Sequence, residues 1–199
     1  MNCSRFRLIH LLALGPMVLA LSGCGINNVP TFDEAVSANW SQVQNQYQRR
    51  ADLVPNLVEA VKGYAKHEKD VLTQVVEARA KVAQLQLPKD VLTNPEAFKQ
   101  FQQHQDQLSA SLARLMVVVE QYPQLKANEN FLALQSQLEG TENRISVARR
   151  DYIQAVQTYN TELRTIPGRW WAAVLYPDAK VKENFTAPAE SQQAPKVKF

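Results

Sequence analysis

The chain of 199 residues is poor in the residues on which most metal and catalytic sites depend. Its three histidines, His10, His67 and His104, form no HExxH motif and no pair at ligand spacing, which argues against a zinc site. The six glycines are scattered, so there is no glycine-rich phosphate loop, and no serine lies in a GxSxG motif. The sequence therefore predicts no cofactor, no metal site and no catalytic residues.

A strong excess of one charge is also missing. The chain has 22 basic and 19 acidic residues, and Arg5 and Arg7 lie in the first 23 residues, which contain no acid. The remainder is therefore close to neutral. Because nucleic-acid binding needs a concentrated basic surface, we expect no DNA or RNA partner.

The first 24 residues resemble the export signal of a bacterial lipoprotein. Arg5 and Arg7 precede an apolar run at residues 8–21, which is shorter than the roughly 20 residues of a membrane-spanning helix. The run ends in LSGC at residues 21–24, which is similar to a lipobox. The alternative is an ordinary signal peptide or an uncleaved anchor with an incidental cysteine.

The lipobox resemblance implies cleavage before Cys24 and a diacylglyceryl group, with fatty acyl chains such as palmitate, on the Cys24 thiol. Cys3 would leave with the leader, so no thiol remains for a disulfide. Gly25, rather than an aspartate, follows the cysteine. We therefore expect a periplasm-facing lipoprotein of the cell envelope, at the outer membrane in preference to the inner one.

Three long stretches have the apolar spacing of amphipathic helices, with steps of three and four residues. The first covers residues 39–85. The second opens with the cap sequence NPE at residues 94–96 and stops at Pro123, and the third covers residues 128–168. Pro55 interrupts the first stretch, so either this helix continues with a kink or a new helix, capped by Asp52, begins there.

This pattern predicts an all-α fold, namely an elongated antiparallel bundle of three long helices, or four if the first is split at Pro55, plus a short C-terminal helix. The predicted divisions are a lipoprotein signal peptide (1–23), a flexible tether (24–31), the helical bundle (32–185) and a disordered tail (186–199).

Arg50 is the most informative polar residue, because it falls on the apolar stripe of the first stretch. A buried arginine needs a carboxylate, and Glu120 or Glu142 on another helix could pair with it and set the helix register. The alternative is an interaction patch, in which Pro55 leaves carbonyl groups free and a partner docks there. That patch comprises Arg49, Arg50, Asp52, Pro55 and Asn56.

Aromatic residues gather in the short segment after Gly168. Trp170, Trp171 and Tyr176 could cap the open end of the bundle. They could also contact lipid or a partner, because tryptophan and tyrosine favour such interfaces.

Two parts of the chain contain distinctive motifs. The first is RRADLVPNLV at residues 49–58, followed by VKGY at 61–64 and HE at 67–68; the second includes EQYPQLKAN at 120–128, LEGTENRI at 138–145, YN at 159–160, Pro167 and Phe185. With these motifs the chain closely resembles the LemA family over about residues 34–185. This resemblance implies a membrane-attached helical bundle that faces away from the cytoplasm and has no established enzymatic activity. Most relatives look as though they keep a transmembrane helix where this chain has a lipobox.

These observations together predict a lipid-anchored, non-catalytic scaffold or adaptor of the bacterial cell envelope. Its partners would be the membrane, through Cys24, and an envelope protein, and the long apolar stripes also allow self-association. The alternatives are an enzyme or accessory subunit acting on envelope peptides or cell wall, and a carrier of an apolar ligand.

Overall fold

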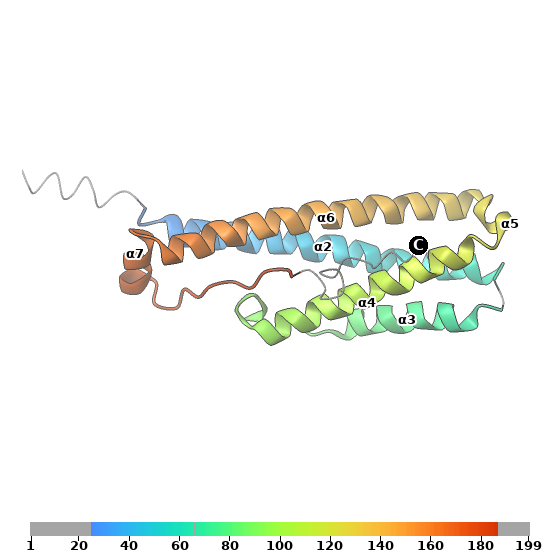
Figure 1. Cartoon of the computed structure of the whole chain (residues 1–199), viewed down its shortest axis with the longest axis horizontal. Coiled ribbons are helices and arrows are strands. Elements are labelled where there is room, and N and C mark those ends of the chain that lie inside the picture. The colour runs from blue at the N-terminus through green and yellow to red at the C-terminus, as the bar shows by residue number, and fades with distance from the viewer. Residues whose placement is uncertain (1–24, 66, 187–199) are drawn as a thin grey trace, which may run out of the picture.

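A computed structural model describes residues 25–65 and 67–186 of the chain (Figure 1). The helices in these residues are α2 (Asn28–Lys62), α3 (Lys69–Gln84), α4 (Pro95–Val119), α5 (Pro123–Lys126), α6 (Glu129–Arg164) and α7 (Gly168–Leu175), with a 3-10 turn, η1 (Val91–Thr93), before α4. The described ranges contain no strand, and the predicted all-α class is confirmed.

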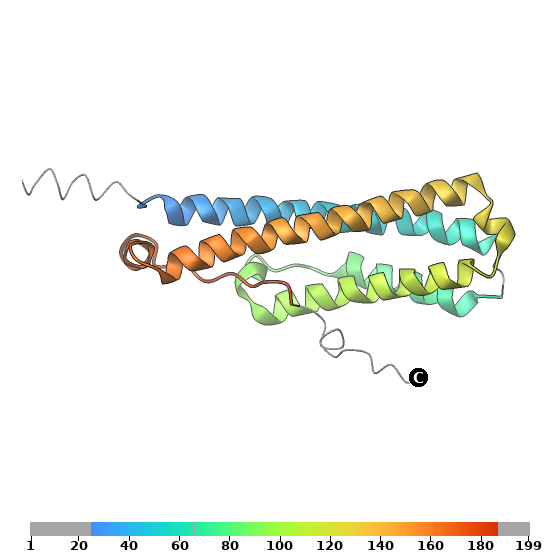
Figure 2. The same ribbon diagram turned by 45° about the horizontal axis from the view of Figure 1, so that its top comes forward.

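The helices form an elongated antiparallel bundle. The two longest, α2 and α6, run side by side in opposite directions, and α3 and α4 form a second pair against them (Figures 1 and 2). At 1.5 Å per residue, α2 and α6 are each about 50 Å long. The start of α2, the end of α6 and α7 lie at one end of this rod, while the end of α2, the start of α3 and α5 lie at the other (Figure 1).

The prediction of a single helix over residues 39–85 is wrong. The chain reverses at residues 63–68, between α2 and α3, and it does not reverse at Pro55. The apolar spacing continues across this loop because α2 and α3 both turn their apolar stripes toward one core. Tyr64 fits the stripe but is 44% exposed in the loop, whereas Ala65 beside it is buried.

Pro55 lies inside α2, and the helix continues past it. A proline has no N–H, so the carbonyl oxygen of Ala51, four residues earlier, loses its usual partner. Arg79 of α3 supplies a replacement, because its Nε donates to the Ala51 oxygen at 3.2 Å. The proline therefore frees a carbonyl group that joins α2 to α3.

We predict that the effects of Pro55 and Arg79 on stability are coupled. Arg79→Met should cost about 1 kcal/mol in the natural chain, because it leaves the Ala51 carbonyl without a donor. The same change should cost much less beside Pro55→Ala, which restores an N–H within the helix. Urea unfolding of the four proteins in this double-mutant cycle measures the coupling. Equal costs of Arg79→Met in both backgrounds would contradict it.

The helix starts are set by the predicted caps. The Asn94 side chain accepts a hydrogen bond from the Ala97 N–H at 3.2 Å, and the Asn128 side chain accepts one from the Phe131 N–H at 3.1 Å. Both asparagines thus satisfy N–H groups that the first turn of a helix leaves free. The predicted starts of α4 and α6 are confirmed.

The bundle extends further at both ends than the sequence predicted. Helix α2 begins at Asn28, within the segment predicted as a flexible tether, because Val29 is buried and the Asn28 amide donates to Glu162 of α6 at 3.1 Å. Thr186, predicted as the start of a disordered tail, accepts a hydrogen bond on its carbonyl oxygen from the Gln102 amide at 2.5 Å. Residues 1–24 and 187–199 lie outside the described part of the chain.

An extended segment, residues 176–186, follows α7 and runs back toward the middle of the rod (Figure 1). We call it the C-terminal strap. The Tyr152 hydroxyl donates to the Glu183 carbonyl at 2.8 Å, and the Asn160 amide exchanges hydrogen bonds with the backbone of Lys182. Burial raises the pKa of Tyr152. The strap therefore covers part of α6, and side chains of α6 bind the backbone of the strap.

The interior contains two apolar clusters along the rod. The α7-end core is aromatic, with the rings of Trp40, Phe101 and Tyr152 in contact and Phe185 of the strap 5.1 Å from Phe98 between ring centres. The α5-end core is mostly aliphatic, with Val54, Leu57, Val61, Val75, Leu108, Leu115 and Leu125 among its members, and it also contains Phe131.

Candidate interaction site

Arg50 lies between these two cores, with 1% of its surface exposed. Its Nη1 donates to Ser109 Oγ at 2.5 Å and to Glu142 Oε1 at 3.1 Å, and its Nη2 donates to the backbone oxygen and to Oε1 of Gln105 at 3.0 and 2.7 Å. The guanidinium carbon lies 4.9 Å from the centre of the Tyr47 ring, within cation–π range. Burial, more than any neighbouring charge, raises the pKa of the Tyr47 hydroxyl.

These four polar residues, Arg50, Gln105, Ser109 and Glu142, form what we call the Arg50 belt, which links α2, α4 and α6. Of the two acids expected as partners, Glu142 contacts Arg50, whereas Glu120 pairs with Lys126 at 2.6 Å. A slip of α4 or α6 along α2 would remove the acceptors of a buried charge. We infer that the belt fixes the register of the three helices.

Arg50 is not part of the proposed patch around Pro55. Arg50 points into the core, while Arg49, Asp52, Pro55 and Asn56 are exposed on the outside of α2. Asp52 accepts a hydrogen bond from Gln48 of the same helix at 2.8 Å. The carbonyl of Ala51, which Pro55 frees, already has a donor in Arg79 of α3. The expectation that a partner finds free carbonyl groups at Pro55 is therefore wrong for this oxygen.

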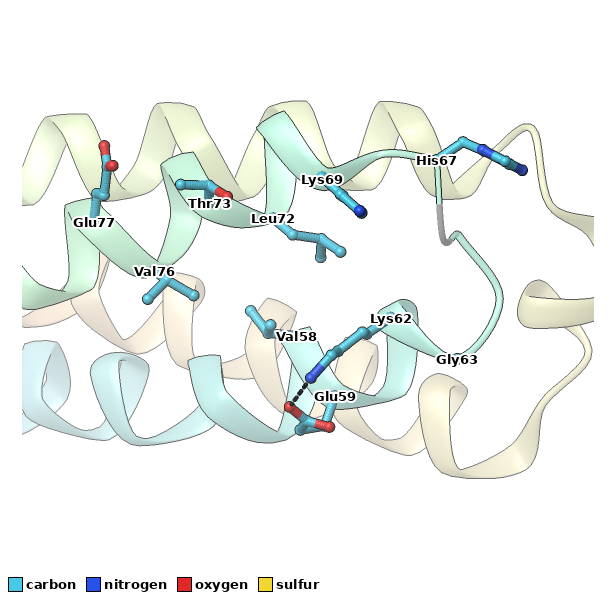
Figure 3. Close-up of a pocket in the computed structure, with 10 residues that line it drawn as sticks. All are labelled: Val58, Glu59, Lys62, Gly63, His67, Lys69, Leu72, Thr73, Val76 and Glu77. Carbon is cyan, nitrogen blue, oxygen red and sulfur yellow. Dashed lines mark hydrogen bonds and ion pairs between the residues drawn. The ribbon is translucent and has the colours of Figure 1, made fainter.

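A groove opens between α2 and α3, beside the loop that joins them (Figure 3). Its volume is about 1120 Å³. Val58 and Leu72 are each 9% exposed and form part of the floor, and Val76 is 48% exposed. Lys62 and Glu59 pair at 3.3 Å on one side of the opening, and Lys69 and Glu77 also line it.

This lining has the chemistry of a binding surface. Figure 3 shows the side chain of His67 at the loop end, directed away from Val58 and Leu72. Within residues 25–65 and 67–186, no three His, Cys, Asp or Glu residues lie close enough together to bind a metal ion. An apolar floor with charges of both signs at the rim is typical of a groove that receives an amphipathic helix.

The aromatic residues expected at the bundle end have different environments. Tyr176 packs against the α7-end core, and its hydroxyl donates to the Ile26 carbonyl at 3.2 Å. Trp171 is half-buried. Trp170, by contrast, is 60% exposed on the outside of α7. One side of α7 therefore covers the core, and the other faces solvent.

Comparison with known proteins decides the family. The LemA family model matches residues 39–199, which is most of the chain. The chain belongs to the LemA family. The match begins within α2 and includes α3, the groove, the Arg50 belt, α7 and the C-terminal strap.

Three relatives show how far this LemA chain resembles known sequences. Magnetosome proteins MamQ 1 and MamQ 2 of Paramagnetospirillum magneticum are each 27% identical over 164 residues, which is 74% of this chain and 60% of each relative. Protein LemA of Metamycoplasma hominis is 24% identical over 125 residues, or 63% of this chain and 53% of the relative. The LemA chain thus spans little more than half the length of these relatives.

The strap contacts were not predicted from the sequence. Asn160 and Phe185 belong to the segments that carry the family resemblance, and both hold the strap: Asn160 bonds Lys182, and Phe185 enters the aromatic core. The available signal was that both residues lie in segments that resemble the family, although neither lies on an apolar helix stripe. Cys24, the predicted lipid attachment site, lies outside the described residues. In the described part of the chain, no helix combines the length and apolarity needed to cross a membrane.

Proposed function

We propose that this LemA-family protein is a lipid-anchored, non-catalytic adaptor of the bacterial cell envelope. Cys24 holds one end of the rod at a membrane, and the groove between α2 and α3 binds a protein partner near the other end. The observation that carries the proposal is that the start of α2, which follows Cys24 in the sequence, and the groove lie at opposite ends of the rod (Figure 1). About 45 Å of helix separates Asn28 from Val58.

The shape and lining of the groove favour a helical segment of a partner protein over a small ligand. Small-molecule pockets enclose roughly 300–1,000 Å³ and bury most of the ligand. The groove has paired charges such as Lys62 and Glu59 at its edge, and Val76 in its lining is 48% exposed, so the groove would leave much of a small ligand uncovered. These features support the adaptor more than the carrier of an apolar ligand.

The comparisons support the membrane setting of this proposal. The LemA family match, together with relatives that bear the name magnetosome protein, supports a membrane-associated bacterial protein. Attachment through the Cys24 lipid, with export to the outer membrane, is the finer part of the proposal. It rests on the LSGC motif at residues 21–24 and on Gly25 after it.

Site-specific photo-cross-linking in living cells tests the groove. A photoreactive residue at Val76, inside the groove, should capture one envelope protein that a residue at Val117 does not capture. Val117 is the matched control, because it is 66% exposed on α4 and outside the groove. Leu72→Asp should then abolish capture from Val76, since a charge at the floor opposes an apolar contact.

Three outcomes would count against the adaptor. Capture of the same protein from Val76 and Val117 would show that the groove is not the contact site. Lipid bound to the purified protein in native mass spectrometry would favour the carrier. Turnover of envelope peptides by the purified protein would show that it is an enzyme and would contradict the non-catalytic adaptor.

A further inference from the structure

We propose that α7 is a membrane-contacting foot, which lies in the interfacial region of the same bilayer that holds the N-terminal lipid. The foot consists of Ile166, just before α7, and of Trp170, Val174 and Leu175. This inference rests on the proposed anchor at Cys24. It adds a second contact, made by the folded domain itself.

The exposure of α7 is the first observation. Ile166 is 64% exposed, Trp170 60%, Val174 75% and Leu175 46%. Trp170 and Val174 are four residues apart and share one face of the helix. A helix that is apolar on both sides is normally covered on both sides.

The opposite face of α7 is already in use. Gly168 is buried, and Ala172 and Tyr176, at successive steps of four, pack against the α7-end core. A methyl group on Gly168 would collide with the backbone oxygen of Glu162, so α7 lies directly against the end of α6. The helix is therefore held firmly, with its second apolar face directed outward.

The position of α7 identifies the surface that covers this face. The Tyr176 hydroxyl donates a hydrogen bond to the Ile26 carbonyl at 3.2 Å. A Cβ atom added to Gly25 would lie 3.6 Å from Pro167 Cγ, so this glycine is next to the start of α7. Gly25 directly follows Cys24, and consecutive Cα atoms are about 3.8 Å apart. A bilayer that receives the acyl chains of Cys24 is therefore within reach of α7.

The side chains of the foot suit a lipid headgroup region. Tryptophan favours the membrane–water interface, where its ring is in an apolar layer and its N–H can reach water. Val174 and Leu175 would enter the upper acyl region, as in helices that lie in the plane of a membrane. Arg164 and Arg169, both exposed, flank the start of α7 and can pair with lipid phosphates.

Spin labels on the full lipidated protein test the foot. Val174→Cys and the matched control Val117→Cys each place one label, and the proteins are reconstituted on vesicles of phosphatidylethanolamine and phosphatidylglycerol. The reference is the unlipidated chain that starts at Gly25, in solution without detergent. We expect the Val174 label to be several-fold less accessible to a water-soluble nickel relaxant on vesicles than in this reference. The Val117 label should not change.

The possible outcomes separate the foot from the anchor. If the protein floats with vesicles but the Val174 label stays as accessible as the Val117 label, the foot is overturned and the anchor stands. If the natural protein does not float, the anchor fails and the foot fails with it. Magnetic broadening between Val174 labels would mean that a second copy covers this face, which also overturns the foot.

Discussion

Replacing Arg50 with methionine should destabilise the bundle by about 3 kcal/mol, the largest effect that we expect from a single side chain. Methionine fills part of the space but leaves the side-chain oxygen of Gln105 buried without its donor. It also removes the second hydrogen bond to the Gln105 backbone oxygen, which keeps its partner within helix α4. Ser109 also loses its contact. In a domain of this size, the melting temperature should fall by roughly 6–12 °C, which circular dichroism measures.

The neighbouring arginine provides the control. Arg49→Met removes the same charge from the outer face of α2 and should change stability by less than about 0.5 kcal/mol. Similar melting temperatures for the two variants would contradict a structural role of the Arg50 belt.

The geometry also indicates how the ion pair contributes. Three of the four hydrogen bonds of Arg50 go to Gln105 and Ser109, and only one goes to Glu142. The side chain of Glu142 is 42% exposed and can be solvated when it is unpaired. An exchange of the two charges, Arg50→Glu with Glu142→Arg, should therefore restore little stability, because the buried backbone oxygen of Gln105 cannot donate to a glutamate at position 50.

Replacing Cys24 with alanine should move nearly all of the protein from the membrane to the soluble fraction or leave it uncleaved with its leader. Each buried CH₂ of an acyl chain contributes about 0.8 kcal/mol, so two or three chains hold far more strongly than the foot alone. Cell fractionation with intact-mass measurement of the natural protein checks both the attachment and the acylation.

The other cysteine of the chain serves as the control. Cys3→Ala lies in the leader and should leave the membrane fraction unchanged. If a cleaved Cys24→Ala protein still pelleted with membranes, or if the natural protein had an unmodified N-terminus, the lipid anchor would be wrong.

Local signals explain why much of the helical structure could be predicted. Asn94 and Asn128 cap helices through contacts within one turn, so their role is visible in a few adjacent residues. The same reasoning failed at residues 63–68. Apolar spacing records which side of a segment faces a core, and it does not record whether the chain has turned around before the next segment.

The burial of Arg50 could be predicted from the sequence, but most of its hydrogen-bond partners could not. Its place on an apolar stripe indicated a buried charge that needs partners on other helices. Gln105 and Ser109 could not be singled out, because their polar side chains look like those of any solvated helix face. Their role depends on which side of α4 faces α2, and only the packed structure shows that this side contains Gln105 and Ser109.

The sequence by itself determined the helical class and the starts of α4 and α6, because caps and periodicity are each contained in short stretches. The lipoprotein-type signal, which rests on the LSGC motif, stays a prediction. Only the tertiary structure decided where α2 and α3 separate, that Arg79 bonds the carbonyl freed by Pro55, and that the strap covers α6. The groove and the outward face of α7 were also decided there. Each of these depends on contacts between residues far apart in the chain, and their geometry exists only once the helices have packed.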